Sequence, residues 1–196
     1  MIEIIIILII ISILFGDRIK GAWGELRLKL KIKLWLNDEY KLISNSYFKT
    51  SFGTTQIDHI LITPKGILVI EIKNYGNVDI HGFEKAKTWS AEYPHGKKYN
   101  MKNPIHQNYG HLKTIEGVLG EKHRIHSVVI FSNSVEFINK MPKNVINEKG
   151  FRPYYLGLGE NKLTSDEIKK YYEKINDKRE DGLFVGIKHY LLQRFR

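Results

Sequence analysis

The chain has 196 residues, 42% of them hydrophobic and 12% aromatic, which excludes a disordered polymer and leaves room for one medium-sized domain. Its formal net charge of +10 favours a polyanionic partner, nucleic acid or an anionic membrane surface, although a lysine-rich surface can also be merely solvated. The absence of cysteine excludes disulfide-linked partners, thiolate metal sites and cysteine nucleophiles.

An apolar run at residues 4–15, dominated by isoleucine, precedes the body of the chain. It is shorter than the roughly 20 residues of a usual spanning helix, but it exceeds the usual length of a buried strand, which is the alternative. A secretory signal is disfavoured because Glu3 stands where a positive charge is expected. We predict a single-pass membrane anchor at residues 1–16. The cationic residues that follow it then place the body in the cytoplasm.

Residues 26–36 alternate between apolar and mostly cationic side chains, in the order Leu-Arg-Leu-Lys-Leu-Lys-Ile-Lys-Leu-Trp-Leu. A period of two favours a strand. Leucine, lysine and arginine, however, are good helix formers, and only Ile32 is β-branched. On a helix the apolar positions would spread around the axis instead of forming one stripe. The residues alone leave both structures open.

A strand, a tight turn and a second strand are predicted at residues 54–63, 64–66 and 67–73. Pro64 suits the second position of a turn, and Gly66 follows it closely. Both strands are apolar on both faces, which is typical of a sheet that helices cover on each side.

The remaining predicted elements are short strands at residues 77–81, 88–91 and 126–131 and helices at residues 103–119, 164–175 and 183–196. Asn103 and Pro104 make an N-cap and a first helical position, and Thr164 with Glu167 makes a capping box. Residues 139–150 are predicted to be a loop. The fold class is α/β, with a mixed central β-sheet flanked by helices, an N-terminal apolar helix and a small helical C-terminal extension.

The hairpin brings two carboxylates together. If its loop has two residues, Thr63 pairs with Gly66 and Asp58 falls opposite Glu71, with Cβ atoms about 4.5–5.5 Å apart. Such carboxylates repel unless a cation lies between them or one is protonated, and Mg²⁺ or Mn²⁺ suits the position. Lys73 shares the face of Glu71, where an ammonium group can orient water and stabilise charge on a phosphate.

Two alternatives stand beside this metal site. A three-residue loop would move Asp58 opposite Ile72, and a strand-end salt bridge would use the same side chains structurally. The Glu-x-Lys tripeptide at residues 71–73 carries little weight by itself, because it recurs at residues 167–169 among helix-capping signals.

An ordered set of residues resembles the nuclease-related domain (NERD) family, within the PD-(D/E)xK restriction-endonuclease-like superfamily, from about residue 20 to residue 132. The set is Gly24-Glu25, Gly53–His59, Pro64–Ile67, Ile70–Gly76, Trp89, Asn103-Pro104 and Gln107. The resemblance implies that Asp58 and Glu71 are metal ligands and that Lys73 is the catalytic lysine. It further implies that Glu25 is an acidic metal-site residue from a preceding helix and that Gln107 is a site residue from a following helix.

The resemblance also favours a helix at residues 26–36. For Glu25 the alternative is an acidic residue in the first turn of a helix, where it would stabilise the helix dipole. His111, one turn after Gln107, is either a catalytic residue or an ordinary polar residue of its helix. We divide the chain into an anchor at residues 1–16, a nuclease-related domain at residues 20–138 and a partly helical extension at residues 139–196.

The function predicted is metal-dependent hydrolysis of phosphodiester bonds in DNA or RNA by a membrane-tethered enzyme. The alternative is a non-catalytic module on a nuclease-like fold, which binds nucleic acid or a membrane through charge.

Overall fold

The computed structural model describes residues 26, 28–36, 40–51, 53–120, 124–160 and 163–180. The predicted anchor, Glu25 and the predicted helix at residues 183–196 lie outside the described residues. Among the described helices, none combines the length and the hydropathy that crossing a bilayer requires.

A helical segment at residues 28–36 precedes a mixed set of strands and helices. In chain order these are β1 (Lys41–Thr50), β2 (Gly53–Thr63), β3 (Gly66–Lys73), β4 (Val78–His81), β5 (Thr88–Glu92), β6 (Lys98–Lys102), α2 (Pro104–Leu119), β7 (Ile125–Phe131), β8 (Val135–Phe137), β9 (Val145–Asn147), the 3-10 turn η1 (Glu148–Gly150), α3 (Phe151–Leu156) and α4 (Ser165–Asp177).

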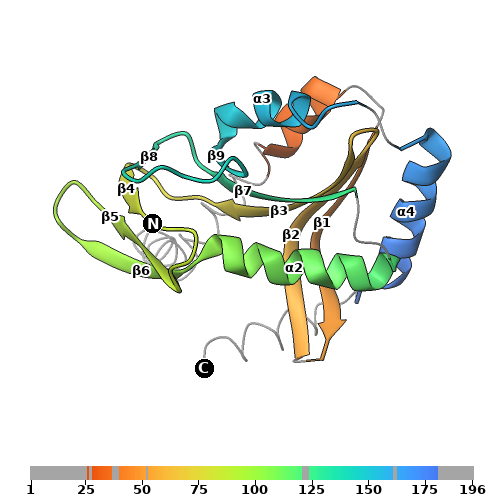
Figure 1. Ribbon diagram of the computed structural model, residues 1–196, viewed down its shortest axis with the longest axis horizontal. Helices are drawn as coiled ribbons and strands as arrows, with labels where there is room; N and C mark the ends of the chain where they lie inside the picture. Colours follow the sequence, from red (N-terminus) through yellow and green to blue (C-terminus); the bar gives the residue numbers. More distant parts are fainter. Residues whose placement is uncertain are drawn as a thin grey trace, which may run out of the picture.

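The strands form two mixed sheets, which confirms the predicted α/β class. The large sheet has the order β1-β2-β3-β7-β9, antiparallel from β1 to β3 and parallel from β3 to β9. The small sheet has the order β6-β5-β4-β8 and was not foreseen as a separate sheet. Figure 1 shows it at the left, beyond the end of β3.

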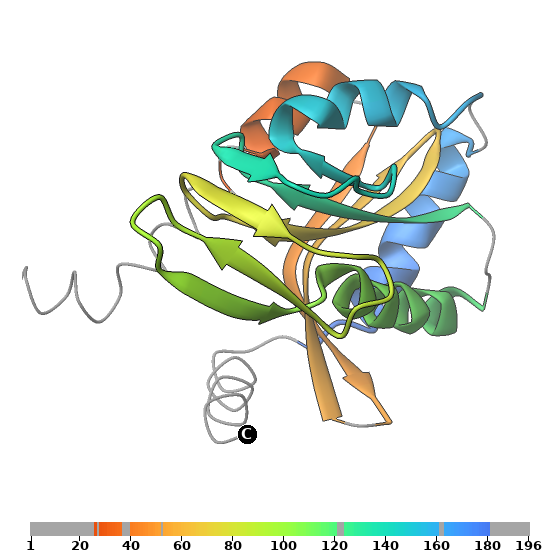
Figure 2. The same ribbon diagram turned by 60° about the vertical axis from the view of Figure 1, so that its left-hand side comes forward.

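Helices cover both faces of the large sheet, as Figures 1 and 2 show. α2 and α4 lie on one face, where Ile60 and Ile62 of β2 point into a core with Ile115 of α2. The segment at residues 28–36 lies with α3 on the other face, where Leu61 joins a second core. Neighbouring residues of β2 therefore enter opposite cores, which explains why the hairpin strands are apolar on both faces.

The small sheet closes over a third core around Trp89, which is 1% exposed and stacks on Phe131 at a centroid distance of 6.3 Å. Gly82 permits this packing, because a Cβ atom there would come within 2.2 Å of the Trp89 ring. The small sheet is thus fixed to the end of β7.

The segment at residues 28–36 is helical, so the prediction of a helix is confirmed there. Leu28 and Ile32 point inward and are 1% and 0% exposed. Lys31 ties the segment to η1 through a 2.7 Å ion pair with Glu148. The alternating sequence therefore forms a helix whose inner stripe is buried.

The predicted helices at α2 and α4 and the predicted strand at β7 are confirmed, with Asn103 as the N-cap of α2 and a capping box at Thr164. The predicted loop at residues 139–150 is wrong in its second half, which contains β9 and η1. β9 is only three residues long and is held by pairing with β7. The sequence of these three residues alone therefore does not predict a strand.

Candidate active site

A two-residue turn, Pro64-Lys65, joins β2 to β3 and sets their register. Thr63 faces Gly66, and the antiparallel pairing runs without a slip to His59 and Ile70. The three-residue loop is therefore excluded, and the register predicted from the turn is confirmed over this length.

The two strands separate at the next position, where Asp58 and Glu71 follow in register. Beyond His59 the pairing of β2 continues with β1, whereas β3 continues beside β7. The Oδ2 atom of Asp58 accepts a hydrogen bond from the backbone N of Ile72 at 2.8 Å. The Asp58 carboxylate therefore acts as the acceptor that a backbone carbonyl of β2 would provide in continued strand pairing. The result is a fork in which Asp58 lies on the β2 prong and Glu71 on the β3 prong.

Glu71 is the centre of a compact polar cluster and is only 3% exposed. Its Oε1 atom accepts a hydrogen bond from Gln107 Nε2 at 2.7 Å and lies 2.8 Å from Lys73 Nζ. Lys73 Nζ also donates to Gln107 Oε1 at 3.0 Å, so Gln107 bridges the ion pair. The Oε2 atom lies 3.2 Å from His111 Nε2, although neither atom is aligned for a hydrogen bond. The other ring nitrogen of His111 lies 3.1 Å from Thr55 Oγ1.

The charge state of Glu71 follows from these neighbours. Burial raises the pKa of Glu71, but the contact with His111 and the positive charge of Lys73 outweigh burial, and the pKa lies below its usual value. The carboxylate is therefore ionised at neutral pH, as a cation ligand must be.

α2 carries Gln107 and His111 one turn apart on a single face. The Asn103 side chain fixes the start of the helix: its Oδ1 accepts from the backbone N of Ile105 at 2.9 Å, and its Nδ2 donates to the carbonyl of Ala86 at 2.7 Å. Asn108, which is fully buried, donates to the carbonyls of β3 and β7 at 2.9 and 3.0 Å. The helix is thus held at the large sheet and at the loop between β4 and β5 of the small sheet.

The donor set of the fork fits a hard divalent cation. Asp58 and Glu71 supply carboxylate oxygens, and Glu71 Oε2 is buried without a conventional hydrogen bond. No group of three His, Cys, Asp or Glu side chains gathers at metal-binding distance among the described residues. The described residues thus offer two carboxylates to an ion, and Mg²⁺ commonly binds through one or two carboxylates with water. Glu25, the third predicted ligand, lies outside the described residues.

Comparison with known proteins identifies the family of the chain that carries this fork. Residues 20–132 match the family model described as the nuclease-related domain. The chain belongs to the nuclease-related domain family. It is also 32% identical over 161 residues to an uncharacterised protein of Bacillus anthracis, and the alignment covers 80% of this chain and 75% of that protein.

A cleft of about 1040 Å³ opens beside α2 of the NERD domain, and Gln107 and His111 contribute to its wall. Its lining includes five lysines and no Asp or Glu among the described residues: Lys49, Lys87, Lys102, Lys113 and Lys178. Lys49 and Lys113 are paired with glutamates, whereas the other three make no ion pair with a described residue.

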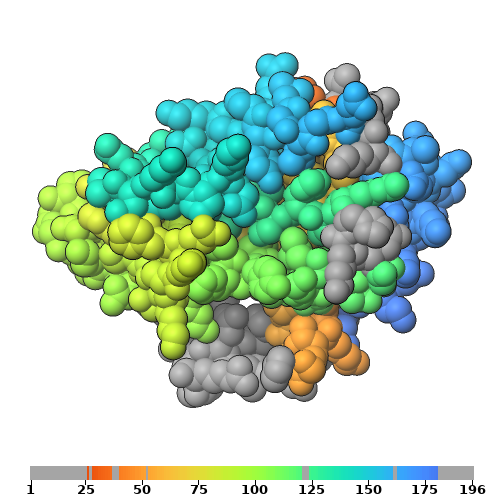
Figure 3. Space-filling view, in the orientation of Figure 1, coloured from red at the N-terminus to blue at the C-terminus, as the bar shows by residue number. Residues whose placement is uncertain are grey.

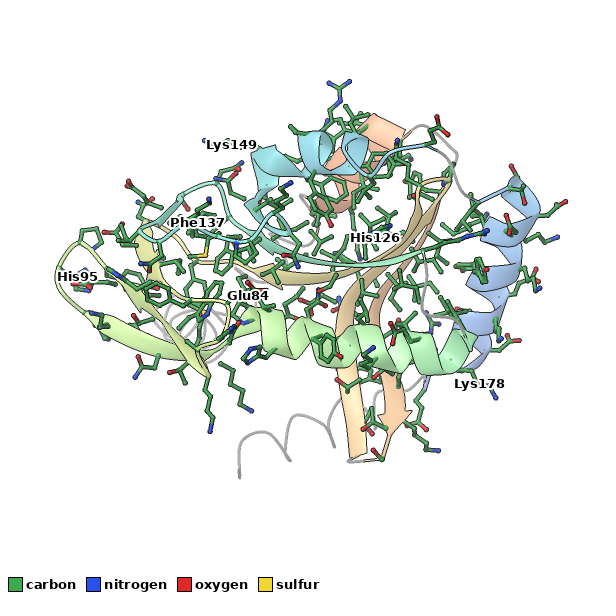
Figure 4. All side chains as sticks on the ribbon, in the orientation of Figure 1. Glu84, His95, His126, Phe137, Lys149 and Lys178 are labelled. Atoms are coloured by element: carbon green, nitrogen blue, oxygen red, sulfur yellow. The ribbon has the colours of Figure 1, made fainter. Side chains whose placement is uncertain are left out.

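The cleft lies where separate elements meet. In the space-filling view α2 runs between the small sheet and α4, with the tip of the β1–β2 hairpin below it (Figure 3). Figure 4 places Lys178, at the end of α4, beside the C-terminal end of α2. Positive charge thus comes from both ends of the helix.

The structure brings Glu71, Lys73 and Gln107 into direct contact and sets Asp58 on the opposite prong of the fork. The cluster also contains His111, whose role the sequence had left open. Its spacing of four residues from Gln107 was the available signal. The lysines of the cleft come from distant segments, and no local pattern marks them as a set.

Proposed function

We propose that this NERD domain is a metal-dependent nuclease that hydrolyses phosphodiester bonds in DNA or RNA. The observation that carries the proposal is the contact of buried Glu71 with Lys73 and Gln107, beside a cleft whose described lining holds lysines and no acid. The cluster holds one acid, Glu71, beside Lys73, and Asp58 on the opposite prong supplies the second acid of the PD-(D/E)xK pattern. The cleft supplies the positive charge that a phosphate backbone requires.

Each residue has a defined task in this proposal. Asp58 and Glu71 would hold Mg²⁺ or Mn²⁺, which when bound supplies Lewis acidity and an activated water. Lys73, 2.8 Å from Glu71, offers positive charge to the phosphoryl oxygens as negative charge develops on them. Gln107 donates to Glu71 and accepts from Lys73, and so fixes the geometry of both.

The cleft supplies the binding surface. Lys87, Lys102 and Lys178 make no ion pair with a described residue and can contact phosphates along a strand. Because these contacts release counterions, we expect binding to weaken steeply with salt.

The proposal includes a membrane tether through residues 4–15 and a cytoplasmic body, as the apolar run and the cationic residues after it predict. The tether would keep the nuclease at the bilayer without restricting the kind of nucleic acid that enters the cleft.

The decisive experiment compares cleavage by the full chain and by Lys73→Ala, with DNA and RNA substrates and with Mg²⁺, Mn²⁺ or EDTA. We expect cleavage that EDTA abolishes, and a loss of about 100-fold or more in Lys73→Ala. Lys169→Ala is the matched control, because Lys169 ends the same tripeptide on α4, away from the cluster. It should cleave like the unaltered chain, and equal cleavage by both variants would reject the proposal.

The alternative, a non-catalytic module, is favoured by the basic lining of the cleft. It predicts binding of nucleic acid that persists in EDTA, without cleavage under any metal condition. The same samples therefore distinguish the two functions.

A further inference from the structure

The helix at residues 28–36 carries an exposed leucine stripe on the side away from the core. Leu26, Leu30 and Leu34 are 47%, 55% and 78% exposed, whereas Leu28 and Ile32 are buried. Residues spaced by four lie along one face of a helix, so the three leucines form a continuous apolar strip. A contiguous exposed apolar strip is a candidate contact surface.

Lysines border the strip. At about 100° per residue, Lys29 and Lys33 fall along one edge of it. Lys33 is exposed, and neither lysine makes an ion pair with a described residue. Lys31 lies on the other side of the strip and forms an ion pair with Glu148. The outer face is therefore apolar along its middle and cationic at its edge.

The strip belongs to the layer of the molecule that is turned away from the cleft. The segment at residues 28–36 and α3 cover one face of the large sheet, and α2 covers the other (Figures 1 and 2). α3 adds Leu156, which is 58% exposed, to the same layer. A surface that covers this layer would leave the cleft open.

We infer that the leucine strip docks on an anionic lipid bilayer, with the leucines at the boundary of headgroups and acyl chains and the lysines among the headgroups. Long cationic side chains beside an apolar strip are suited to this interface, because their heads reach the lipid charges while the leucines enter it. A second copy docked strip to strip is disfavoured, since its lysine edges would approach each other. The inference does not depend on nuclease activity.

The chain has no cysteine, so a single introduced cysteine can report on one position. The test attaches a nitrobenzoxadiazole fluorophore to Leu34→Cys in the full chain. The matched control carries the fluorophore at Tyr109→Cys, a position that is 57% exposed on α2 in the opposite layer. Both proteins are mixed with vesicles of phosphatidylcholine alone or with phosphatidylglycerol added.

We expect blue-shifted, brighter emission from Leu34→Cys with phosphatidylglycerol vesicles and no change from Tyr109→Cys. Adding Lys33→Gln should lower the ratio of docked to undocked protein about fivefold, the effect of about 1 kcal/mol per cationic side chain. Emission from position 34 that stays aqueous with anionic vesicles would overturn the inference. Emission that is already apolar without vesicles would overturn it too, because another segment or copy would then cover the strip.

Discussion

The energetics of Glu71 favour a functional role over a purely structural one. The side chain is 3% exposed and shares its oxygens among a lysine, a glutamine and a histidine. Removing such charges from water costs several kcal/mol per ion, and an apolar replacement of similar size is often as stable. A cluster of this kind at the end of a β-strand pair therefore contributes little net stability. Its value lies in holding charge in a fixed geometry.

At the scale of the single residue, we predict that Gln107→Ala lowers the rate of cleavage about 10- to 100-fold without unfolding the domain. Gln107 contacts both Glu71 and Lys73, and loss of a partner that orients site residues typically has an effect of this size. The measurement is kcat/KM with Mg²⁺, beside a thermal melt.

Gln56→Ala serves as the matched control, because the one described residue to which the Gln56 side chain donates is Asn45, at 3.3 Å, on the exposed part of the β1–β2 hairpin. A Gln107→Ala protein as active as this control would show that the bridge in the cluster has no role in the reaction.

At the scale of elements, the site depends on two anchors. The turn between β2 and β3 fixes the register that brings Asp58 and Glu71 to the fork, and the Asn108 side chain fixes α2 against the sheet. Residues of α2 reach the fork only because this helix lies along β3 and β7. The hydrogen bonds of Asn108, the next residue along α2, thus fix the position of Gln107.

We predict that Asn108→Ala lowers the free energy of unfolding by about 1–3 kcal/mol, because it removes two buried hydrogen bonds to carbonyls of β3 and β7. The measurement is urea denaturation followed by circular dichroism. Tyr109→Ala, one residue on and 57% exposed, should change the stability by no more than about 0.5 kcal/mol. Equal losses in the two variants would contradict the anchoring role of Asn108.

In the molecule as a whole, the two faces of the large sheet carry different surfaces. One face carries α2 and the basic cleft, and the other carries the helical layer with the leucine strip. Membrane contact on the second face would leave the cleft open to nucleic acid. The division follows from the sheet, because its strands send alternate residues to opposite sides.

We predict that the full chain stays with membranes after carbonate extraction, and that the double variant Ile7→Lys with Ile10→Lys does not. A lysine near the centre of a spanning helix costs about 2.5–3.5 kcal/mol on insertion scales, so two such charges should prevent insertion of residues 4–15. Extraction of the unaltered chain into the soluble fraction would contradict the tether.

Local patterns in the sequence determined those features that depend on neighbours along the chain. A Pro64-Lys65 turn sets the register of its own hairpin, and the caps at Asn103 and Thr164 begin their own helices. The fork of Asp58 and Glu71, with Lys73 on the same strand, follows from that register. The family resemblance implied Gln107 as a site residue, and the structure places it in contact with Glu71 and Lys73. Its role in the reaction stays a prediction.

Other features were decided only by tertiary structure. The alternation at residues 26–36 fits a strand or a helix equally, and burial of Leu28 and Ile32 against the sheet selects the helix. Strands were predicted at β4 and β5, but the joining of β4 to β8 in a separate sheet and the presence of β9 depend on pairing between segments far apart in the chain. The contact of His111 with Glu71 and the gathering of lysines in the cleft join residues far apart in the chain. Packing of whole elements creates these contacts, and a local pattern carries no information about which elements will meet.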